Sequence, residues 1–145
     1  HDDIRQHAKM ARDTDGPIAA LVDDLKSRGL FNETLILISG EFGRTPMIQN
    51  SGLEKLGNGR DHNVHAWTAL MAGGGIKGGI VVGASDEKGY NVTDRVVTMG
   101  DLYATIYKAL GIDWKKEYMT PIGRPIKIAN SLEDKTGEPI KELLA

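Results

Sequence analysis

The sequence predicts an α/β fold with a mostly parallel sheet. Two continuous apolar segments, Thr34–Gly40 and Trp67–Ala72, are typical of strands that are buried on both faces, as central parallel strands are. A helical pattern precedes the first segment and another follows the second, which gives the order helix, strand, loop, strand, helix. We therefore expect the two strands to be neighbours in one sheet, with the helices packed on its faces.

The two helices are expected at Ile4–Arg28 and Thr98–Gly111, where apolar residues recur at helical spacing. Gly16 and Pro17 interrupt the first pattern. Either one long helix bends there, or a second helix begins with Asp15 as its N-cap. The sequence alone leaves both possibilities open.

The remaining segments are shorter or less regular. Residues 43–65 are rich in Gly, Asn, Pro and Ser and are expected to form a loop. Ile80–Gly83 is expected to be a short strand and residues 85–91 a turn-rich loop. The alternating pattern in Pro121–Ala129 indicates a short edge hairpin.

The composition describes an ordinary globular protein and excludes several classes. The chain has 145 residues, 40% hydrophobic residues and a net charge of −2, so no basic excess favours nucleic acid. Because it has no cysteine, disulfides and thiolate metal sites are excluded. No apolar run approaches the roughly 18 residues of a membrane span. The first residue is His and no signal peptide is visible, so we expect a processed or excised piece of a longer protein.

Polar residues cluster where the two strand segments meet the loop, and they are the candidates for chemistry. Glu41 and Arg44 follow the first strand, and Asp61, His62 and His65 precede the second. Imidazole and carboxylate groups bind zinc, manganese, magnesium or calcium, depending on their mixture.

Each of these residues also has a purely structural interpretation. The His and Asp cluster is compatible with a solvated surface, and His65 with a capping or core role. Glu41 and Arg44 are compatible with a structural ion pair at the end of a buried strand, where an unpaired carboxylate is costly. The glycine-rich segment Gly73–Gly79 lacks the spacing of a phosphate-binding loop.

Three strings in this order resemble the DUF1501 family: Glu33–Pro46 (ETLILISGEFGRTP), Gly59–Asn63 (GRDHN) and Ala72–Gly79 (AGGGIKGG). These proteins are bacterial, often exported, and usually placed in the alkaline phosphatase-like superfamily with sulfatases and cofactor-independent phosphoglycerate mutases. Asp101–Gly111 is also similar to a helix of sulfatases. The resemblance implies an alkaline phosphatase-like α/β/α sandwich, of which residues 1–145 would be the carboxyl-terminal part of a single domain. It also implies export to the periplasm or the extracellular space.

The resemblance further implies a site with divalent metal, at which His1, Glu41 and His62 are ligands. Asp61 and His65 are second-tier candidates. Phe42 stands where the superfamily has a second His, and a phenyl ring cannot bind a metal, so this chain departs from a two-metal site. Arg44 is the catalytic candidate, because a guanidinium matches tetrahedral oxyanions bidentately.

The function implied for the full protein is metal-dependent hydrolysis of sulfate or phosphate esters, with a small ester or a sulfated glycan as substrate. In the superfamily the nucleophile belongs to an early strand that this chain does not contain, so we expect the piece alone to lack turnover. The alternative is a binding or structural protein that retains the fold without catalysis, and a third possibility is an α/β domain without metal.

Overall fold

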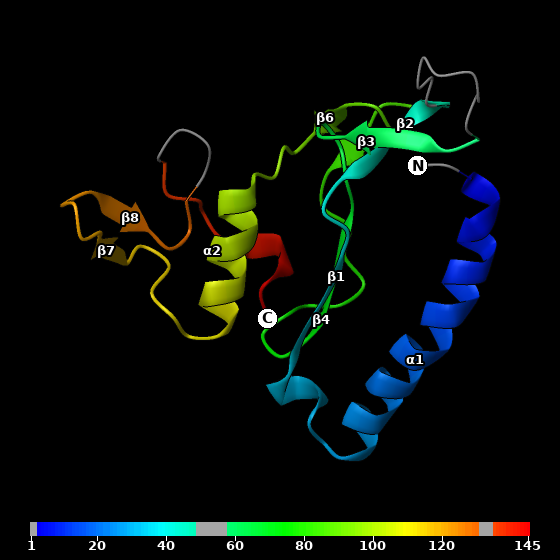
Figure 1. The fold of residues 1–145 in the computed structure, drawn as a ribbon. Helices are drawn as coiled ribbons and strands as arrows, with labels where there is room; N and C mark the ends of the chain where they lie inside the picture. The colour runs from blue at the N-terminus through cyan, green and yellow to red at the C-terminus, as the bar shows by residue number, and fades with distance from the viewer. Residues whose placement is uncertain (1–2, 49–57, 131–134) are drawn as a thin grey trace. The chain divides into compact units, whose positions relative to one another are not determined.

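The structure is a computed structural model that describes residues 3–48, 58–130 and 135–145 (Figure 1). The chain divides into two compact units, which are described separately. The first unit consists of His1–Phe31, Ile38–Leu70 and Ala84–Asp94, and the second of Asn32–Leu37, Met71–Gly83 and Arg95–Ala145.

The expected alkaline phosphatase-like α/β/α sandwich with a mostly parallel sheet is wrong. The described strands form four sheets of two strands each, and the pairs β2–β3, β5–β6 and β7–β8 are antiparallel. The two apolar segments do form strands, β1 (Leu35–Ser39) and β4 (Ala69–Gly73). These two strands are paired with each other, so the prediction that they are neighbours is confirmed.

The exposure of β1 explains why the prediction of a mostly parallel sheet is wrong. A continuous apolar run indicates that both strand faces need cover, but it does not say which segments provide that cover. In the described part of the chain β1 pairs with β4 alone, and Leu37 and Ile38 remain 41% and 36% exposed. Of the β1 side chains only Ile36 is buried.

The segment expected to be a loop, residues 43–65, contains a hairpin of β2 (Gly43–Ile48) and β3 (Arg60–Asn63). Its register pairs Arg44 with His62 and Ile48 with Arg60. Between these two pairs, three residues of β2 lie opposite a single residue of β3. This irregular segment, called the bulge of β2 below, accommodates Pro46, which has no N–H to donate to a ladder. The proline and the polar residues hid the strands from the sequence pattern.

Two further antiparallel pairs are short. The strand expected at Ile80–Gly83 is instead β5 (Ala84–Ser85), which pairs with β6 (Val92–Asp94) across the turn-rich segment. A hairpin is present as β7 (Glu117–Met119) and β8 (Pro125–Lys127), but only β8 lies within the expected range, and β7 lies entirely before it.

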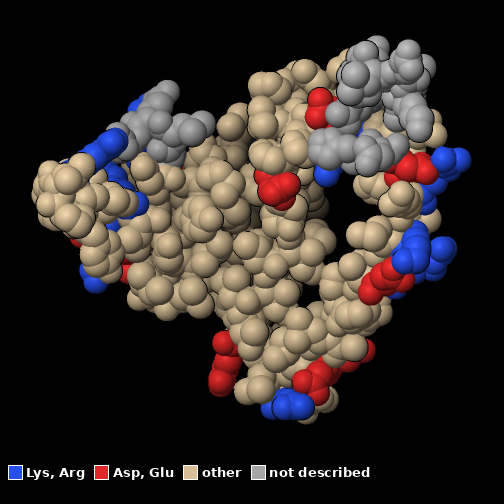
Figure 2. All heavy atoms as spheres, viewed as in Figure 1, with Lys and Arg blue, Asp and Glu red and all other residues tan. Residues whose placement is uncertain are grey.

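In the first unit, α1 (His7–Ser27) follows a single 3₁₀ turn, Ile4–Gln6. The helix continues through Pro17, so the two possibilities left open by the sequence resolve to one helix. Its charged side chains of both signs are interspersed along the surface (Figure 2), with ion pairs Lys9–Asp13 and Arg28–Asp24 one turn apart.

In the second unit, α2 (Met99–Ala109) begins with a capping box between Thr98 and Asp101, which confirms the second predicted helix. Thr105 on this helix is fully buried, and its hydroxyl accepts a hydrogen bond from the Ile140 backbone N–H at 2.9 Å. Other short 3₁₀ turns lie at Phe31–Glu33 and Lys141–Leu143. Among the described residues, neither helix combines the length and apolar character needed to cross a membrane.

Candidate functional site

The hairpin of β2 and β3 begins with a close approach of two backbone segments. A Cβ atom on Gly43 would lie 1.8 Å from the carbonyl oxygen of Ala66, a distance that no side chain tolerates. Glycine is therefore required where the Glu41–Pro46 motif enters β2. This contact sets the position of β2 beside the chain that leaves β3.

Arg44 and His62 occupy opposite positions on the two strands. Side chains of directly paired residues lie on the same face of an antiparallel pair, so Arg44 and His62 share one side of the hairpin. The rings of Phe42 and His62 are stacked, with centroids 4.7 Å apart and an interplanar angle of 29°. Arg44 donates one long hydrogen bond, 3.4 Å from its Nη1 to the Arg60 carbonyl oxygen, and its side chain is exposed. The hairpin thus presents a guanidinium and an imidazole to solvent on one side.

The other predicted site residues lie as follows. Glu41 is exposed in the bend between β1 and β2, so the argument from a buried carboxylate does not apply to it. In the described residues Glu41 and Arg44 form no ion pair. Asp61 accepts a 2.7 Å hydrogen bond from the His62 backbone N–H, and the His65 ring lies 5.9 Å from that of Tyr90. His1 lies outside the described residues.

The described residues do not assemble a metal site. Over residues 3–48, 58–130 and 135–145, no three His, Asp or Glu side chains lie close enough together to hold an ion. Glu41 and His62 are the candidate ligands within these ranges, and the third, His1, is not. The donor set present therefore does not fit the expected divalent metal by itself.

Asn63 is a site residue that the sequence analysis did not single out. It is 2% exposed and joins the hairpin to the segment that precedes β6. Its side-chain Nδ2 donates to the carbonyl oxygens of Gly89 at 3.3 Å and Tyr90 at 2.9 Å, and its Oδ1 accepts from the His65 N–H at 3.1 Å. The available signal was a polar residue closing the Gly59–Asn63 string immediately before an apolar run.

The family model described as "Protein of unknown function (DUF1501)" matches residues 1–144. The chain belongs to the DUF1501 family. No curated protein and no solved structure matched it. The DUF1501 match therefore confirms the family resemblance and covers the whole hairpin together with the segment that Asn63 holds, but it names no activity.

In this DUF1501 chain, Asp86 organises the segment between β5 and β6. Its carboxylate accepts hydrogen bonds from the backbone N–H groups of Lys88, Tyr90 and Asn91 at 3.1, 2.8 and 2.9 Å. These bonds, led by the one from Tyr90, hold the pKa of Asp86 below its usual value. Gly89, at φ +70°, provides the left-handed residue that the turn needs.

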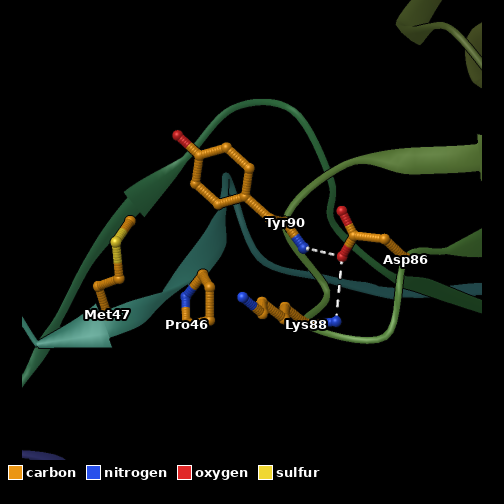
Figure 3. Close-up of a pocket in the computed structure, with 5 residues that line it drawn as sticks. All are labelled: Pro46, Met47, Asp86, Lys88 and Tyr90. Atoms are coloured by element: carbon orange, nitrogen blue, oxygen red, sulfur yellow. Dashed lines mark hydrogen bonds between the residues drawn. The ribbon is translucent and has the colours of Figure 1, made fainter.

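A pocket of about 600 Å³ opens between this segment and the bulge of β2 (Figure 3). Pro46 and Met47 line it from the bulge, and Asp86, Lys88 and Tyr90 line it from the other segment. Bulges often redirect side chains next to functional sites. The pocket thus adjoins the strand that carries Arg44, and sequence pattern could not locate it because the bulge was not foreseen.

Proposed function

We propose that the protein containing this chain hydrolyses sulfate or phosphate esters, and that the β2–β3 hairpin binds the tetrahedral anion. The observation that carries the proposal is the placement of Arg44 directly opposite His62, with both side chains exposed. The wider placement in the alkaline phosphatase-like superfamily, and export from the cell, belong to the same proposal and are supported by the sequence motifs alone.

The chemistry of the two side chains favours an oxyanion. A guanidinium presents parallel N–H groups that match two oxygens of a sulfate or phosphate. His62 lies opposite Arg44, and the stacked Phe42 ring restricts the orientation of its imidazole. Since the bond of Arg44 to the Arg60 carbonyl is long, little is lost when the guanidinium turns to an anion.

Divalent metal is part of the expected mechanism, but the described donor set does not hold it. We therefore derive no step through a metal and assign no nucleophile. What the described residues of the chain support is the binding and charge neutralisation of the anion.

The second candidate is a protein that binds an anion without turnover. Phe42 favours it, because this ring occupies the position of a superfamily ligand and packs against His62. Both candidates share the anion site and differ only in chemistry.

The test uses the full-length protein. Titration calorimetry measures the binding of inorganic sulfate and phosphate, and hydrolysis of aryl sulfates and aryl phosphates is followed with added zinc, manganese, calcium or magnesium. Arg44→Gln should weaken anion binding about 10- to 100-fold, since a hydrogen bond to a charged group contributes about 1.5–3 kcal/mol. Arg44→Lys should fall between this variant and the wild type.

Arg12→Gln, at an exposed position on α1, is the matched control and should bind as the wild type does. Equal affinities of the Arg44→Gln and Arg12→Gln variants, with unchanged thermal melts, would disprove the anion site. Anion binding without hydrolysis under any metal would favour the binding protein over the enzyme.

A further inference from the structure

We propose that the pocket lined by Pro46, Met47, Asp86, Lys88 and Tyr90 binds an aromatic ring carried by the anion that Arg44 holds. This inference rests on the proposed function, since it names the class of ester for the same site. It selects aryl esters over sugar esters.

The backbone on both sides of the pocket is held in place before any ligand arrives. Tyr90 is fixed on both sides of its α-carbon, because its N–H donates to Asp86 and its carbonyl oxygen accepts from Asn63. On the opposite side, the Thr45 hydroxyl donates to the Met47 carbonyl oxygen at 3.0 Å within the bulge. A preformed lining lowers the ordering cost of binding.

The surfaces that face the pocket suit a flat apolar ring. Figure 3 shows the Tyr90 ring and the Pro46 ring on different sides of the space, with the Met47 thioether beside them. Aromatic rings gain from contact with other rings and with thioether sulfur. The space of about 600 Å³ is open to solvent, so a ring would lie against its walls with one side exposed.

The polar groups are too few for a sugar. The Asp86 carboxylate already accepts three backbone hydrogen bonds, so its oxygens face the backbone. Each sugar hydroxyl that loses water needs a new hydrogen-bond partner, whereas an aromatic ring needs none. In the described part of the chain the Lys88 ammonium and the Tyr90 hydroxyl are the remaining polar side-chain groups of the lining, and neither forms a hydrogen bond.

Lys88 sets the preferred charge of the ring. Its side chain extends alongside Pro46 in Figure 3, and it forms no ion pair with the described residues. An ammonium in this position favours a ring with an acidic substituent. Pro46, which lines the pocket, follows Arg44 by two residues on β2, so the pocket and the proposed anion site lie on the same strand. We assign the ring of a monocyclic aryl ester to the pocket for this reason.

The test compares sulfonates, whose C–S bond resists hydrolysis. Calorimetry on the full protein measures methanesulfonate, benzenesulfonate and sulfoquinovose, a sugar sulfonate of equal charge. Benzenesulfonate should bind about 2- to 12-fold more tightly than methanesulfonate, because an aromatic contact contributes about 0.5–1.5 kcal/mol. Sulfoquinovose should show no such gain.

Substitutions in the pocket test whether the gain in affinity for benzenesulfonate arises there. Tyr90→Leu should remove the gain of benzenesulfonate while methanesulfonate binds as before, and Tyr90→Phe should keep the gain. Tyr118→Leu, at an exposed tyrosine of β7, is the matched control and should change neither. If thermal melts show that Tyr90→Leu does not fold, Met47→Ser replaces it, because Met47 is 58% exposed and tolerates substitution.

Para-sulfobenzoate tests the charge of the ring. It should bind more tightly than benzenesulfonate to the wild type, and Lys88→Gln should remove this preference, whereas Lys77→Gln should not. Equal affinity for methanesulfonate and benzenesulfonate overturns the inference and leaves the anion site intact. A gain for sulfoquinovose instead assigns the pocket to carbohydrate and also overturns it. Binding that is absent, or unaffected by Arg44→Gln, overturns the proposed function and this inference together.

Discussion

Removing the Asn63 side chain should destabilise the first unit through a small number of identifiable bonds. The amide makes three hydrogen bonds to backbone groups and is 2% exposed, so water cannot replace it without rearrangement. Asn63→Ala leaves two carbonyl oxygens and one N–H without their partner. At about 1 kcal/mol for each bond, and more where a group stays dry, we expect a loss of about 2–4 kcal/mol in the free energy of unfolding. For a chain of this size that corresponds to roughly 5–15 °C in melting temperature.

The matched control is Asn91→Ala. Asn91 is exposed, and its side chain makes one long hydrogen bond, 3.5 Å from Nδ2 to the Asp86 carboxylate. We expect this variant to lie within about 0.5 kcal/mol of the wild type. Urea denaturation followed by tryptophan fluorescence, together with thermal melts by circular dichroism, measures both. If the two variants lose the same stability, Asn63 does not join the two segments as described.

Asn63→Asp distinguishes the donated bonds from the accepted one. It keeps the oxygen that accepts from His65 but sets a carboxylate against the carbonyl oxygens of Gly89 and Tyr90. Burial beside these oxygens favours the protonated form, so the pKa of the new carboxyl should rise in the folded state. A raised pKa contributes stability at low pH that is lost as pH rises, so the deficit of this variant relative to the wild type should shrink between pH 7 and pH 4. A deficit that grows on acidification would contradict the assignment of Nδ2 to the two carbonyls.

Two further predictions concern backbone contact and acid stability. Gly43→Ala should lower the melting temperature, because its Cβ would meet the Ala66 carbonyl. Gly16→Ala, with open space around it in the middle of α1, should instead raise the free energy of unfolding by about 0.5–1 kcal/mol. Thermal melts of the two variants check the direction of both changes. At Asp101, desolvation raises the pKa, but hydrogen bonds from the Glu138 and Thr98 backbone N–H groups outweigh it, so the net pKa is lowered. A lowered pKa gives stability that is present above the unfolded value of about 3.9 and is lost as pH falls below it. Asp101→Asn should therefore be less stable than the wild type at pH 7. In urea titrations, the difference in the free energy of unfolding between the two proteins should narrow by pH 3. A gap that is independent of pH would contradict this linkage.

The sequence predicted those elements whose signals are local. The helix α2 has its capping residues Thr98 and Asp101 and a periodic apolar face within a short stretch, and all of these were visible in the sequence. The apolar runs of β1 and β4 likewise identified two strands and their pairing. Strand direction and sheet size were misjudged because they depend on partners far along the chain, which no local pattern specifies.

The hairpin that carries the candidate site was missed for a related reason. Arg44, Asp61 and His62 were recognised as chemistry-bearing residues, but a stretch rich in glycine, proline and polar side chains has the composition of a loop. Its strands are held by the Gly43 contact with Ala66 and by the pairing of Arg44 with His62, which are contacts between residues some twenty positions apart. The sequence therefore identified candidate site residues, but it did not identify the hairpin that positions them.

The pocket depends on two features that are only defined in three dimensions. The bulge of β2 redirects Pro46 and Met47, and the bonds of Asn63 bring Tyr90 to face them. Neither a bulge nor a buried amide has a sequence signature comparable to a capping box. The same asparagine therefore links stability to binding: a variant that loses the Asn63 bonds should also lose the affinity gain for an aromatic sulfonate, even where the protein remains folded and Arg44 still binds the simple anion.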